Sequence, residues 1–234
     1  MTIVNDILDL ATSVLHAREL REAGVSLACA AIHAAPSRPD GQRPESDIGA
    51  VFERRRAEYA AGRICAELAM SSLGFPPSQI PTGVRGQPEW PSGLVGSITH
   101  VRGVAMAVVA RRPRVCALGI DLEEVSRATP ELHRFVSTTE DVARVAAAYP
   151  RGRFGDALLF SAKESALKAL DSLGVGPVLP REIAISFRDQ GLGFDCSVRG
   201  PEAVAHALDG KNVIGRLASS PEHVATTLVV LPSP

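Results

Sequence analysis

Two helical stretches of this chain end in the same way. AELAMSSLGFPP (66–77) and SALKALDSLGVGP (165–177) each close on Ser-Leu-Gly, and a proline follows shortly afterwards. Because glycine readily adopts the left-handed conformation that ends many helices, Gly74 and Gly174 have an ordinary explanation as helix caps. The alternative is a duplicated α+β unit, in which a ligand would bind at the seam between the two copies.

The other segments alternate between helical and strand-like patterns of apolar residues. Helices are predicted over 5–23, 51–73, 138–149 and 155–173, and strands over 25–32, 94–100, 103–110, 115–121, 182–187, 192–198, 213–218 and 224–231. Residues 36–47, rich in Pro, Gly and polar side chains, are typical of a loop. The order predicts an α+β fold.

Size and charge exclude several classes of protein. With 234 residues, the chain buries about 70% of its unfolded surface, so its core needs no disulfide or metal. A formal net charge of -1 argues against a general nucleic-acid or membrane-surface binder. The longest apolar runs, 103–110 and 224–231, are too short to span a bilayer. The N-terminus has no basic segment of a signal peptide, and the four cysteines contain no CxxC pair. We therefore expect a cytoplasmic protein with reduced thiols, without a nucleic-acid or membrane partner.

The segment LGIDLEEV (118–125) places two carboxylates just after an apolar run. In a strand, residues two apart point to the same face, so Asp121 and Glu123 are expected to aim at one point. Two such oxygen ligands suit Mg²⁺, which completes its shell with water and substrate phosphates. The ordinary alternative is that acidic residues after a strand face solvent.

The segment FSAKESALKAL (160–170) contains two of the three lysines of the chain. Glu164 and Lys168 are four residues apart and share a helix face, which is also the spacing of an ordinary surface pair. If Glu164 lay beside Asp121 and Glu123, three carboxylates would repel one another strongly. Such a site would require a divalent cation, with lysines to balance an incoming phosphate.

Two further segments contain groups that suit phosphate oxygens. VGSITH (95–100) offers the hydroxyls of Ser97 and Thr99 and the imidazole of His100. ERRRAEYAAGR (53–63) places Arg55 and Arg63 on one helix face, and guanidinium groups bind phosphate with two hydrogen bonds. Each segment alone is equally compatible with an exposed surface.

In combination and order, these segments resemble the 4′-phosphopantetheinyl transferase superfamily, specifically its larger single-chain class that activates siderophore, peptide and polyketide synthases. The matching blocks are ERRRAEYAAGRICAELAMSSLG, GQPEWPSGLVGSITH, LGIDLEEV and FSAKESALKAL, which span residues 53–170. The Gly-Ile-Asp-x-Glu and Phe-Ser-x-Lys-Glu-x-x-x-Lys blocks are the most specific.

The resemblance implies a metal site and a catalytic helix. Asp121, Glu123 and Glu164 would hold Mg²⁺, or Mn²⁺, against the pyrophosphate of coenzyme A, and Glu164 is also a candidate base. Lys163 and Lys168 would neutralise charge on the transferring phosphate and on the leaving group. Because Leu122 cannot be a ligand, water is expected to fill that coordination position.

The resemblance also implies which residues bind coenzyme A, the substrate that supplies the transferred group. His100, with Ser97 or Thr99, would contact the phosphates. Arg55 and Arg63 would bind the 3′-phosphate, and Arg85 lies where family members often carry a basic residue near the adenine.

The implied fold is a pseudo-dimer of two similar α/β halves, residues 1–114 and 115–234, with the active site at their interface. The implied activity is transfer of phosphopantetheine from coenzyme A to a serine of an apo acyl or peptidyl carrier protein, by a monomer. The main alternative is a non-catalytic scaffold that binds coenzyme A or a carrier domain. An ATP-dependent phosphotransferase is disfavoured, because the sequence contains no P-loop.

Overall fold

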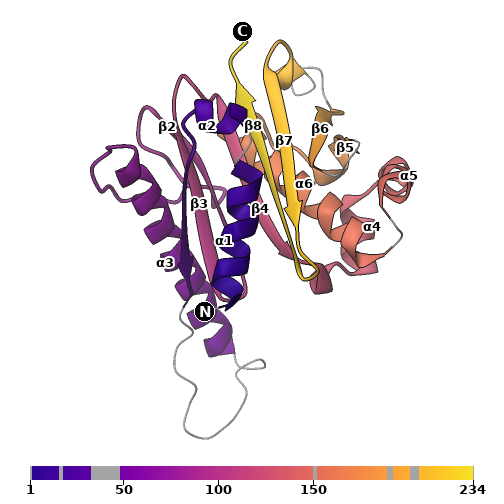
Figure 1. Ribbon diagram of the computed structural model, residues 1–234, viewed down its shortest axis with the longest axis horizontal. Coiled ribbons are helices and arrows are strands. Elements are labelled where there is room, and N and C mark those ends of the chain that lie inside the picture. Colours follow the sequence, from indigo (N-terminus) through magenta and orange to yellow (C-terminus); the bar gives the residue numbers. More distant parts are fainter. Residues whose placement is uncertain are drawn as a thin grey trace, which may run out of the picture.

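The chain forms two antiparallel sheets, each packed against a long helix (Figure 1). The computed structural model describes residues 2–15, 18–32, 48–149, 152–188, 192–200 and 206–233, and the predicted loop over 36–47 lies outside them. The prediction of an α+β fold is confirmed. Among these residues, no helix is long and apolar enough to cross a membrane.

Most predicted elements are present with small shifts of their ends, but the described part of the helix predicted over 5–23 forms two helices, Thr2–Leu15 and Arg18–Glu22. The helices are α1 (Thr2–Leu15), α2 (Arg18–Glu22), α3 (Ile48–Ser72), α4 (Pro130–Val136), α5 (Thr139–Ala148) and α6 (Arg153–Ser172), with 3-10 turns η2 (Val125–Arg127), η3 (Pro180–Glu182) and η4 (His206–Leu208). The strands are β1 (Ser26–Ala31), β2 (Leu94–Val101), β3 (Val104–Arg111), β4 (Ala117–Glu124), β5 (Ile183–Phe187), β6 (Gly193–Val198), β7 (Asn212–Ser219) and β8 (His223–Leu231). Helix α4 was not predicted. Strand β4 runs further than predicted, so the acidic cluster lies within the strand.

The strand order supports the interpretation of the chain as two similar halves. The first sheet has the order β1-β3-β2, and the second has β4-β8-β7-β6-β5. In each half, the first strand precedes the long helix and pairs with the second strand of a later hairpin, β2–β3 or β7–β8. Strands β5 and β6 extend only the second sheet. The hairpin equivalent to β2–β3 is therefore β7–β8.

The ends of α3 and α6 are built alike. Gly74 has φ +78° and Gly174 has φ +75°, and the residue after each glycine donates a 3.1 Å hydrogen bond, to the carbonyl of Met70 or Leu170. These bonds satisfy the last carbonyl groups of each helix, which is why both sequences carry glycine there.

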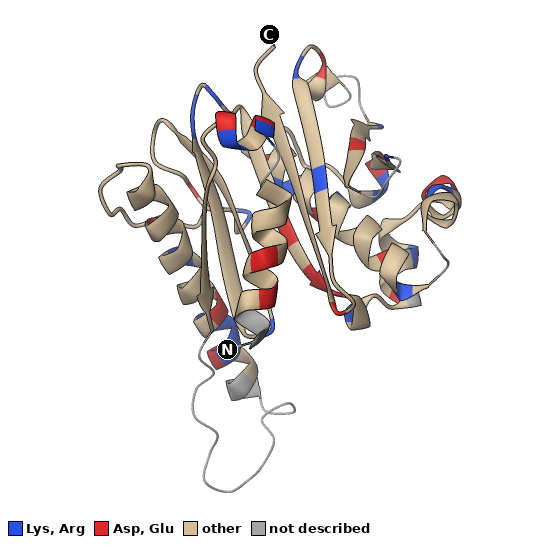
Figure 2. Ribbon diagram, viewed as in Figure 1, with Lys and Arg blue, Asp and Glu red and all other residues tan. Residues whose placement is uncertain are grey.

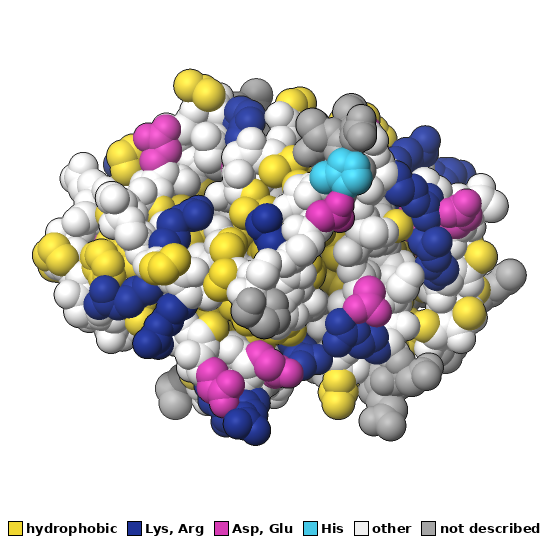
Figure 3. Space-filling view, turned by 90° about the horizontal axis from the view of Figure 1, so that it is seen from above, with side chains coloured by type: hydrophobic (Ala, Val, Ile, Leu, Met, Phe, Trp, Pro, Cys, Tyr) yellow, Lys and Arg dark blue, Asp and Glu magenta, His cyan; other side chains and the backbone are white. Residues whose placement is uncertain are grey.

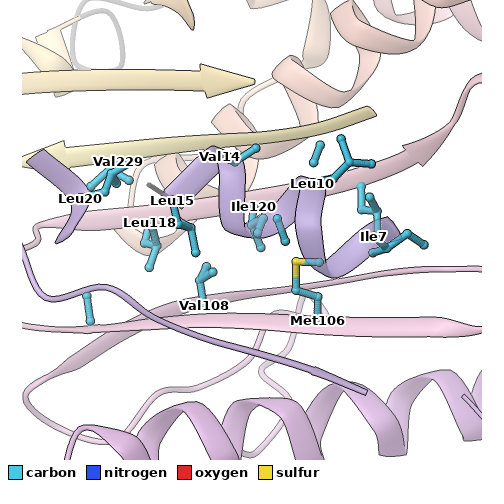
Figure 4. Packing of buried hydrophobic residues seen from close by; sticks show 14 of the residues in the cluster. Ile7, Leu10, Val14, Leu15, Leu20, Met106, Val108, Leu118, Ile120 and Val229 are labelled. Atoms are coloured by element: carbon cyan, nitrogen blue, oxygen red, sulfur yellow. The ribbon is translucent and has the colours of Figure 1, made fainter. Parts of the chain in front are cut away.

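Helix α1 joins the two halves through a shared core (Figure 4). Its buried Ile7 and Val14 belong to the same cluster as Met106 of β3 and Ile120 of β4. The opposite face of the first sheet packs against α3, and the opposite face of the second sheet packs against α6. Strands β2 and β4 lie beside each other, and both contribute residues to this cluster.

Close packing of α6 on β4 determines where the acidic strand lies. A Cβ atom at Gly119 would lie 1.8 Å from the carbonyl oxygen of Ser165, so only glycine allows this approach. At the edge of β4 that faces β2, the amide of Ile120 donates a 3.1 Å hydrogen bond to Ser97 Oγ. The end of β4 is thereby enclosed between α6 and β2.

The charged residues are distributed unevenly over this frame. Acidic segments lie along β4, at the junction between the halves (Figure 2). Figure 3 looks onto one end of the molecule, where Lys and Arg side chains form separate groups with apolar surface between them. On that face the basic residues do not form a single field, in agreement with the near-zero net charge.

Candidate active site

Asp121 is the centre of the site at the junction of the halves. Its side chain is 4% exposed, and its Oδ1 accepts a 2.6 Å hydrogen bond from Lys168 Nζ of α6. The same ammonium donates to the carbonyl of Ile120 at 3.1 Å, and Thr99 Oγ1 lies 3.4 Å from Asp121 Oδ1. The second carboxylate oxygen, Oδ2, is buried and has no hydrogen-bond partner among the described residues. A buried carboxylate oxygen without a donor is costly, so Oδ2 favours a cationic ligand.

The electrostatic environment of Glu123 and Glu164 indicates that both lie close to Asp121. Burial and the charge of Asp121 raise the pKa of Glu123 to about 7, although Arg127 and Lys168 oppose this shift. Burial also raises the pKa of Glu164; Lys168 opposes this increase and Asp121 adds to it. The three predicted metal ligands therefore repel one another, and one lysine balances only part of their charge.

A divalent cation fits the chemistry of these carboxylates, but the ligands are not assembled into a finished site. Within the described part of the chain, no group of three or more His, Cys, Asp or Glu side chains is arranged to hold a metal ion. Even so, the orphaned Oδ2 of Asp121 and the raised pKa of Glu123 are both features that a bound cation would relieve. Asp121, Glu123 and Glu164 thus supply suitable oxygen donors.

The pKa of Glu123 gives a prediction for the metal-free protein. The folded state keeps the proton on Glu123 up to about pH 7, whereas an ordinary glutamate releases it near the reference value of 4.5. The folded state thus binds more protons between these values, so the free energy of unfolding should fall as the pH rises from about 4.5 to about 7. Glu123→Gln should remove this loss and be more stable than the wild type by about 3 kcal/mol at pH 8, because each pKa unit corresponds to about 1.4 kcal/mol.

Urea unfolding with a metal chelator, at pH 5 and pH 8, measures this difference. The exposed Glu222→Gln is the matched control and should follow the wild type at both pH values. Equal stability of Glu123→Gln and the wild type at pH 8 would show that Glu123 is not held in a desolvated, acidic environment.

A cavity of about 800 Å³ opens beside the acidic strand and is rich in basic side chains. We call it the arginine cavity; its lining includes Arg54, Arg55, Arg63, His100, Arg102 and Arg127. Glu58 and Glu124 are its two carboxylates, so positive charge predominates. Such a lining suits a ligand with several phosphate groups.

Arg63 is the most constrained cation of the arginine cavity. Its Nη2 donates to Thr82 Oγ1 at 3.0 Å, and its Cζ lies 4.8 Å from the ring centroid of Tyr59. Its Nε is buried and has no hydrogen-bond partner among the described residues. Thr82 and the Tyr59 ring thus hold the guanidinium in the wall of the cavity, and its remaining N–H donors suit an anion.

A second cavity, of about 820 Å³, lies on the other side of the loop that contains Gly86 and Pro88. We call it the Trp90 cavity. It is lined by apolar side chains that include Trp90, Leu94, Leu167, Val175 and Val178, together with Ser97 and Lys168. The two cavities share Gly86, Pro88 and Ile98, so one extended ligand can occupy both.

The structure places three of the predicted binding residues in one cavity. Two others lie in surroundings that differ from the prediction. Arg55, Arg63 and His100 line the arginine cavity as a group. Thr99 was expected at a phosphate, but it is 4% exposed and faces Asp121. Arg85 was expected near an adenine, yet it forms an ion pair with Asp171 of α6 and lines the Trp90 cavity.

Lys163 requires a larger correction, because the structure does not place it with Lys168. Its side chain is 1% exposed, and Nζ lies 2.7 Å from Asp141 Oδ2, 2.9 Å from the carbonyl of Val136 and 3.0 Å from that of Pro180. The three hydrogens of the ammonium have three acceptors, so none remains for a phosphate. Lys163 and Lys168 are five residues apart on α6, so they project in different directions.

Sequence reasoning missed several charged residues of the site. Glu58 is four residues after Arg54 on α3, with Arg54 Nε 3.8 Å from its carboxylate, and its other oxygen lies 3.9 Å from His100 Nδ1. The spacing of Arg54 and Glu58 was a usable signal for a pair. Asp171, by contrast, meets Arg85 across 86 positions of sequence, and nothing local indicates that contact.

Comparisons with known proteins agree with this geometry. The family model described as "4'-phosphopantetheinyl transferase N-terminal domain" matches residues 43–110, and that of the "4'-phosphopantetheinyl transferase superfamily" matches residues 117–209. The boundary between these matches falls where the chain passes from β3 to β4.

Three curated proteins illustrate the similarity. The 4'-phosphopantetheinyl transferase Svp of Streptomyces mobaraensis is 37% identical over 78% of this chain and 75% of its own length. The 4'-phosphopantetheinyl transferase PptT of Mycobacterium tuberculosis is 36% identical over 57% of this chain and 60% of its own. Enterobactin synthase component D of Escherichia coli K12 is 38% identical over 50% of this chain and 55% of its own. The last two alignments thus span little more than half of those relatives. On the two family matches and the extent of the first alignment, the chain belongs to the 4′-phosphopantetheinyl transferase superfamily.

Proposed function

We propose that this chain transfers the 4′-phosphopantetheine arm of coenzyme A to a serine hydroxyl of an apo acyl or peptidyl carrier protein, and releases adenosine 3′,5′-bisphosphate. The observation that carries the proposal is the arginine cavity with Arg55 and Arg63 in its wall, together with the Asp121–Lys168 pair, whose lysine lines the adjoining Trp90 cavity. A cavity that suits a phosphate-rich substrate therefore adjoins the residues that we propose act in phosphoryl transfer.

The two cavities accommodate the two ends of coenzyme A. Arg55 and Arg63 suit the 3′-phosphate of the nucleotide, and His100 suits the pyrophosphate. Lys168, which is hydrogen-bonded to Asp121, and Ser97 line the Trp90 cavity, and the pyrophosphate would lie between these residues and His100 of the arginine cavity. The apolar lining of the Trp90 cavity suits the pantetheine arm.

The chemistry requires a proton acceptor and charge neutralisation at the pyrophosphate. The serine oxygen forms a bond to the phosphorus that carries pantetheine, and the bond from that phosphorus to the bridging oxygen breaks. Glu164 accepts the hydroxyl proton. Lys168 balances the negative charge that moves onto the leaving bisphosphate.

The proposal includes dependence on a divalent cation. Asp121, Glu123 and Glu164 would hold Mg²⁺, or Mn²⁺, which when bound supplies positive charge to the pyrophosphate oxygens. The orphaned Oδ2 of Asp121 supports this assignment. We also propose a cytoplasmic monomer, because one chain carries both halves of the site and its four cysteines are free.

Replacement of Arg63 tests its proposed contact with the 3′-phosphate of coenzyme A. Arg63→Met should raise the KM for coenzyme A by roughly 10- to 100-fold, because a charge-assisted contact to the 3′-phosphate is lost. Dephospho-coenzyme A, which lacks that phosphate, should show nearly equal KM values with wild type and variant. Steady-state kinetics with both substrates measures the effect, and Arg114→Met, an exposed arginine outside both cavities, is the control. An equal loss with both substrates would place the 3′-phosphate elsewhere.

Release of adenosine 3′,5′-bisphosphate, followed by chromatography, tests the proposed reaction. One equivalent should appear per apo carrier protein, and none when the acceptor serine is replaced by alanine. A non-catalytic scaffold would bind coenzyme A but release no bisphosphate.

A further inference from the structure

Two arginines of the first half contact the last turn of α6. Arg85, in the loop between α3 and β2, forms an ion pair with Asp171. Arg112, directly after β3, donates a 3.0 Å hydrogen bond from Nη2 to the carbonyl of Ser172. The last carbonyl groups of a helix lack partners within it and carry partial negative charge, so a guanidinium suits this end. We call Arg85 and Arg112 the α6 clamp.

The loop that carries Arg85 is itself fixed to the first half. Thr82 Oγ1 lies 2.9 Å from Tyr59 Oη and accepts a 3.0 Å hydrogen bond from Arg63 Nη2, both on α3. Within the loop, the amide of Arg85 donates a 3.0 Å hydrogen bond to Gln87 Oε1. The ion pair therefore joins α6 to a supported part of the first half.

Arg112 is held at the end of the first sheet. Its amide donates to the carbonyl of Gly93 at 2.9 Å, and its Nε donates to the carbonyl of Leu94, the first residue of β2, at 3.4 Å. Because Nη2 of the same guanidinium reaches Ser172, one side chain links the start of β2 to the end of α6.

The clamp spans the Trp90 cavity. Both arginines and both of their contact residues on α6 line this cavity. The first half contributes one set of apolar lining residues, among them Trp90 and Leu94, whereas α6 and the segment after it contribute another, among them Leu167 and Val175. Since the clamp connects these two sets, it limits how far they can separate.

We infer that Arg85 and Arg112 are positioning residues that set the width of the Trp90 cavity and thereby hold the pantetheine arm of coenzyme A. The inference rests on the proposed function. Ser172 lies one helical turn beyond Lys168, so a displacement of the last turn of α6 also moves Lys168 relative to the first half. A firmly held arm keeps the phosphorus that it carries beside Lys168, and such positioning lowers a reaction barrier.

The first test compares two ligands that differ by the arm. Arg85→Gln and Arg112→Met should each raise the dissociation constant of coenzyme A by about 2- to 5-fold, and the double variant should raise it by about 10-fold. Adenosine 3′,5′-bisphosphate, which lacks the arm, should bind the wild type and the variants with equal affinity. Calorimetric titration measures both ligands.

Two results of these titrations would overturn the inference. If the bisphosphate lost as much affinity as coenzyme A, the arginines would contact the nucleotide directly, as the sequence suggests for Arg85. If neither ligand lost affinity, the clamp would have no part in binding.

Arg111 provides the matched control, because it makes the equivalent contact within one half. It donates a hydrogen bond to the carbonyl of Leu73, just after α3, and its Cζ lies 4.6 Å from the ring centroid of Phe75. Arg111→Met should lower the thermal unfolding midpoint as Arg112→Met does, yet leave the affinity for coenzyme A unchanged. An equal loss of affinity in these two variants would show that the effect reflects stability alone.

The ion pair of the clamp permits a rescue experiment. Arg85→Asp places two carboxylates together, so it should weaken coenzyme A binding more than Arg85→Gln does. Combination with Asp171→Arg restores opposite charges and should return the dissociation constant to within about twofold of the wild type. Failure of this rescue would show that Arg85 does not act through Asp171.

An assay of transfer to an apo carrier protein, run in parallel, separates this inference from the proposed function. Wild-type protein that binds coenzyme A but leaves the carrier unmodified would refute the proposed function. The difference between coenzyme A and the bisphosphate would still decide on the clamp. Wild-type protein that binds no coenzyme A would refute both.

Discussion

Asp121→Asn is expected to lower the turnover of phosphopantetheine transfer on the order of 10³-fold, while the protein remains folded. Asn has the shape of Asp but carries no negative charge. It therefore cannot balance Lys168, whose Nζ lies 2.6 Å from Oδ1, and it offers a weaker ligand than the unpartnered Oδ2. Turnover is measured with saturating coenzyme A and carrier, and folding is checked by the thermal unfolding midpoint.

The matched control for Asp121 is Asp195→Asn. Asp195 is 63% exposed on β6 and pairs with Arg188, so the same substitution removes one carboxylate without touching the site. The control should retain wild-type turnover. If Asp121→Asn also kept its turnover, neither the metal assignment nor the role of the Lys168 pair could stand.

Glu164→Gln should lower turnover by about 10²- to 10³-fold, because an amide cannot accept the serine proton. The KM for coenzyme A should change much less, since Glu164 lines neither cavity. The pH profile gives a second signature. In the wild type, turnover should rise with pH as Glu164 loses its proton. The rise should be absent from the variant.

Glu222→Gln, at an exposed position after β7, is the control for this second prediction. It should keep both the turnover and the pH profile of the wild type. Normal turnover of Glu164→Gln, or an unchanged rise in its pH profile, would show that another group acts as the base.

Much of the fold and part of the site were predictable because their signals are local. Glycine after Ser-Leu marks both long helices, and continuous apolar runs mark β3 and β8. The two-residue spacing of Asp121 and Glu123 in one strand, and the eight-residue spacing of Arg55 and Arg63 in one helix, also place side chains correctly. In each case the interacting groups lie within one element.

The misplaced residues are those whose surroundings come from distant parts of the chain. Ser97 and Thr99 share a face of β2, as alternation predicts, but only the position of β4 shows that this face meets Ile120 and Asp121. Lys163 meets Asp141 from 22 positions away, and Arg85 meets Asp171 from 86. A family motif fixes which residues are present, whereas tertiary packing decides what each one touches.

The arrangement of the halves gives the duplicated helix ends a functional meaning. The first half contributes most of the lining of the arginine cavity and the second contributes Glu124 and Arg127, whereas Asp121, Glu164 and Lys168 all lie in the second half. The matching positions Arg63 and Lys163 have different surroundings: Arg63 lines the arginine cavity, and Lys163 is buried in its own half.

The most direct test of the central claim is the intact mass of an apo carrier protein after incubation with coenzyme A and this protein. With Mg²⁺, the carrier should gain the mass of one phosphopantetheine group; with a metal chelator, or with the acceptor serine replaced by alanine, its mass should not change. A carrier whose mass stays unchanged in the presence of Mg²⁺ and coenzyme A would contradict the proposed transfer.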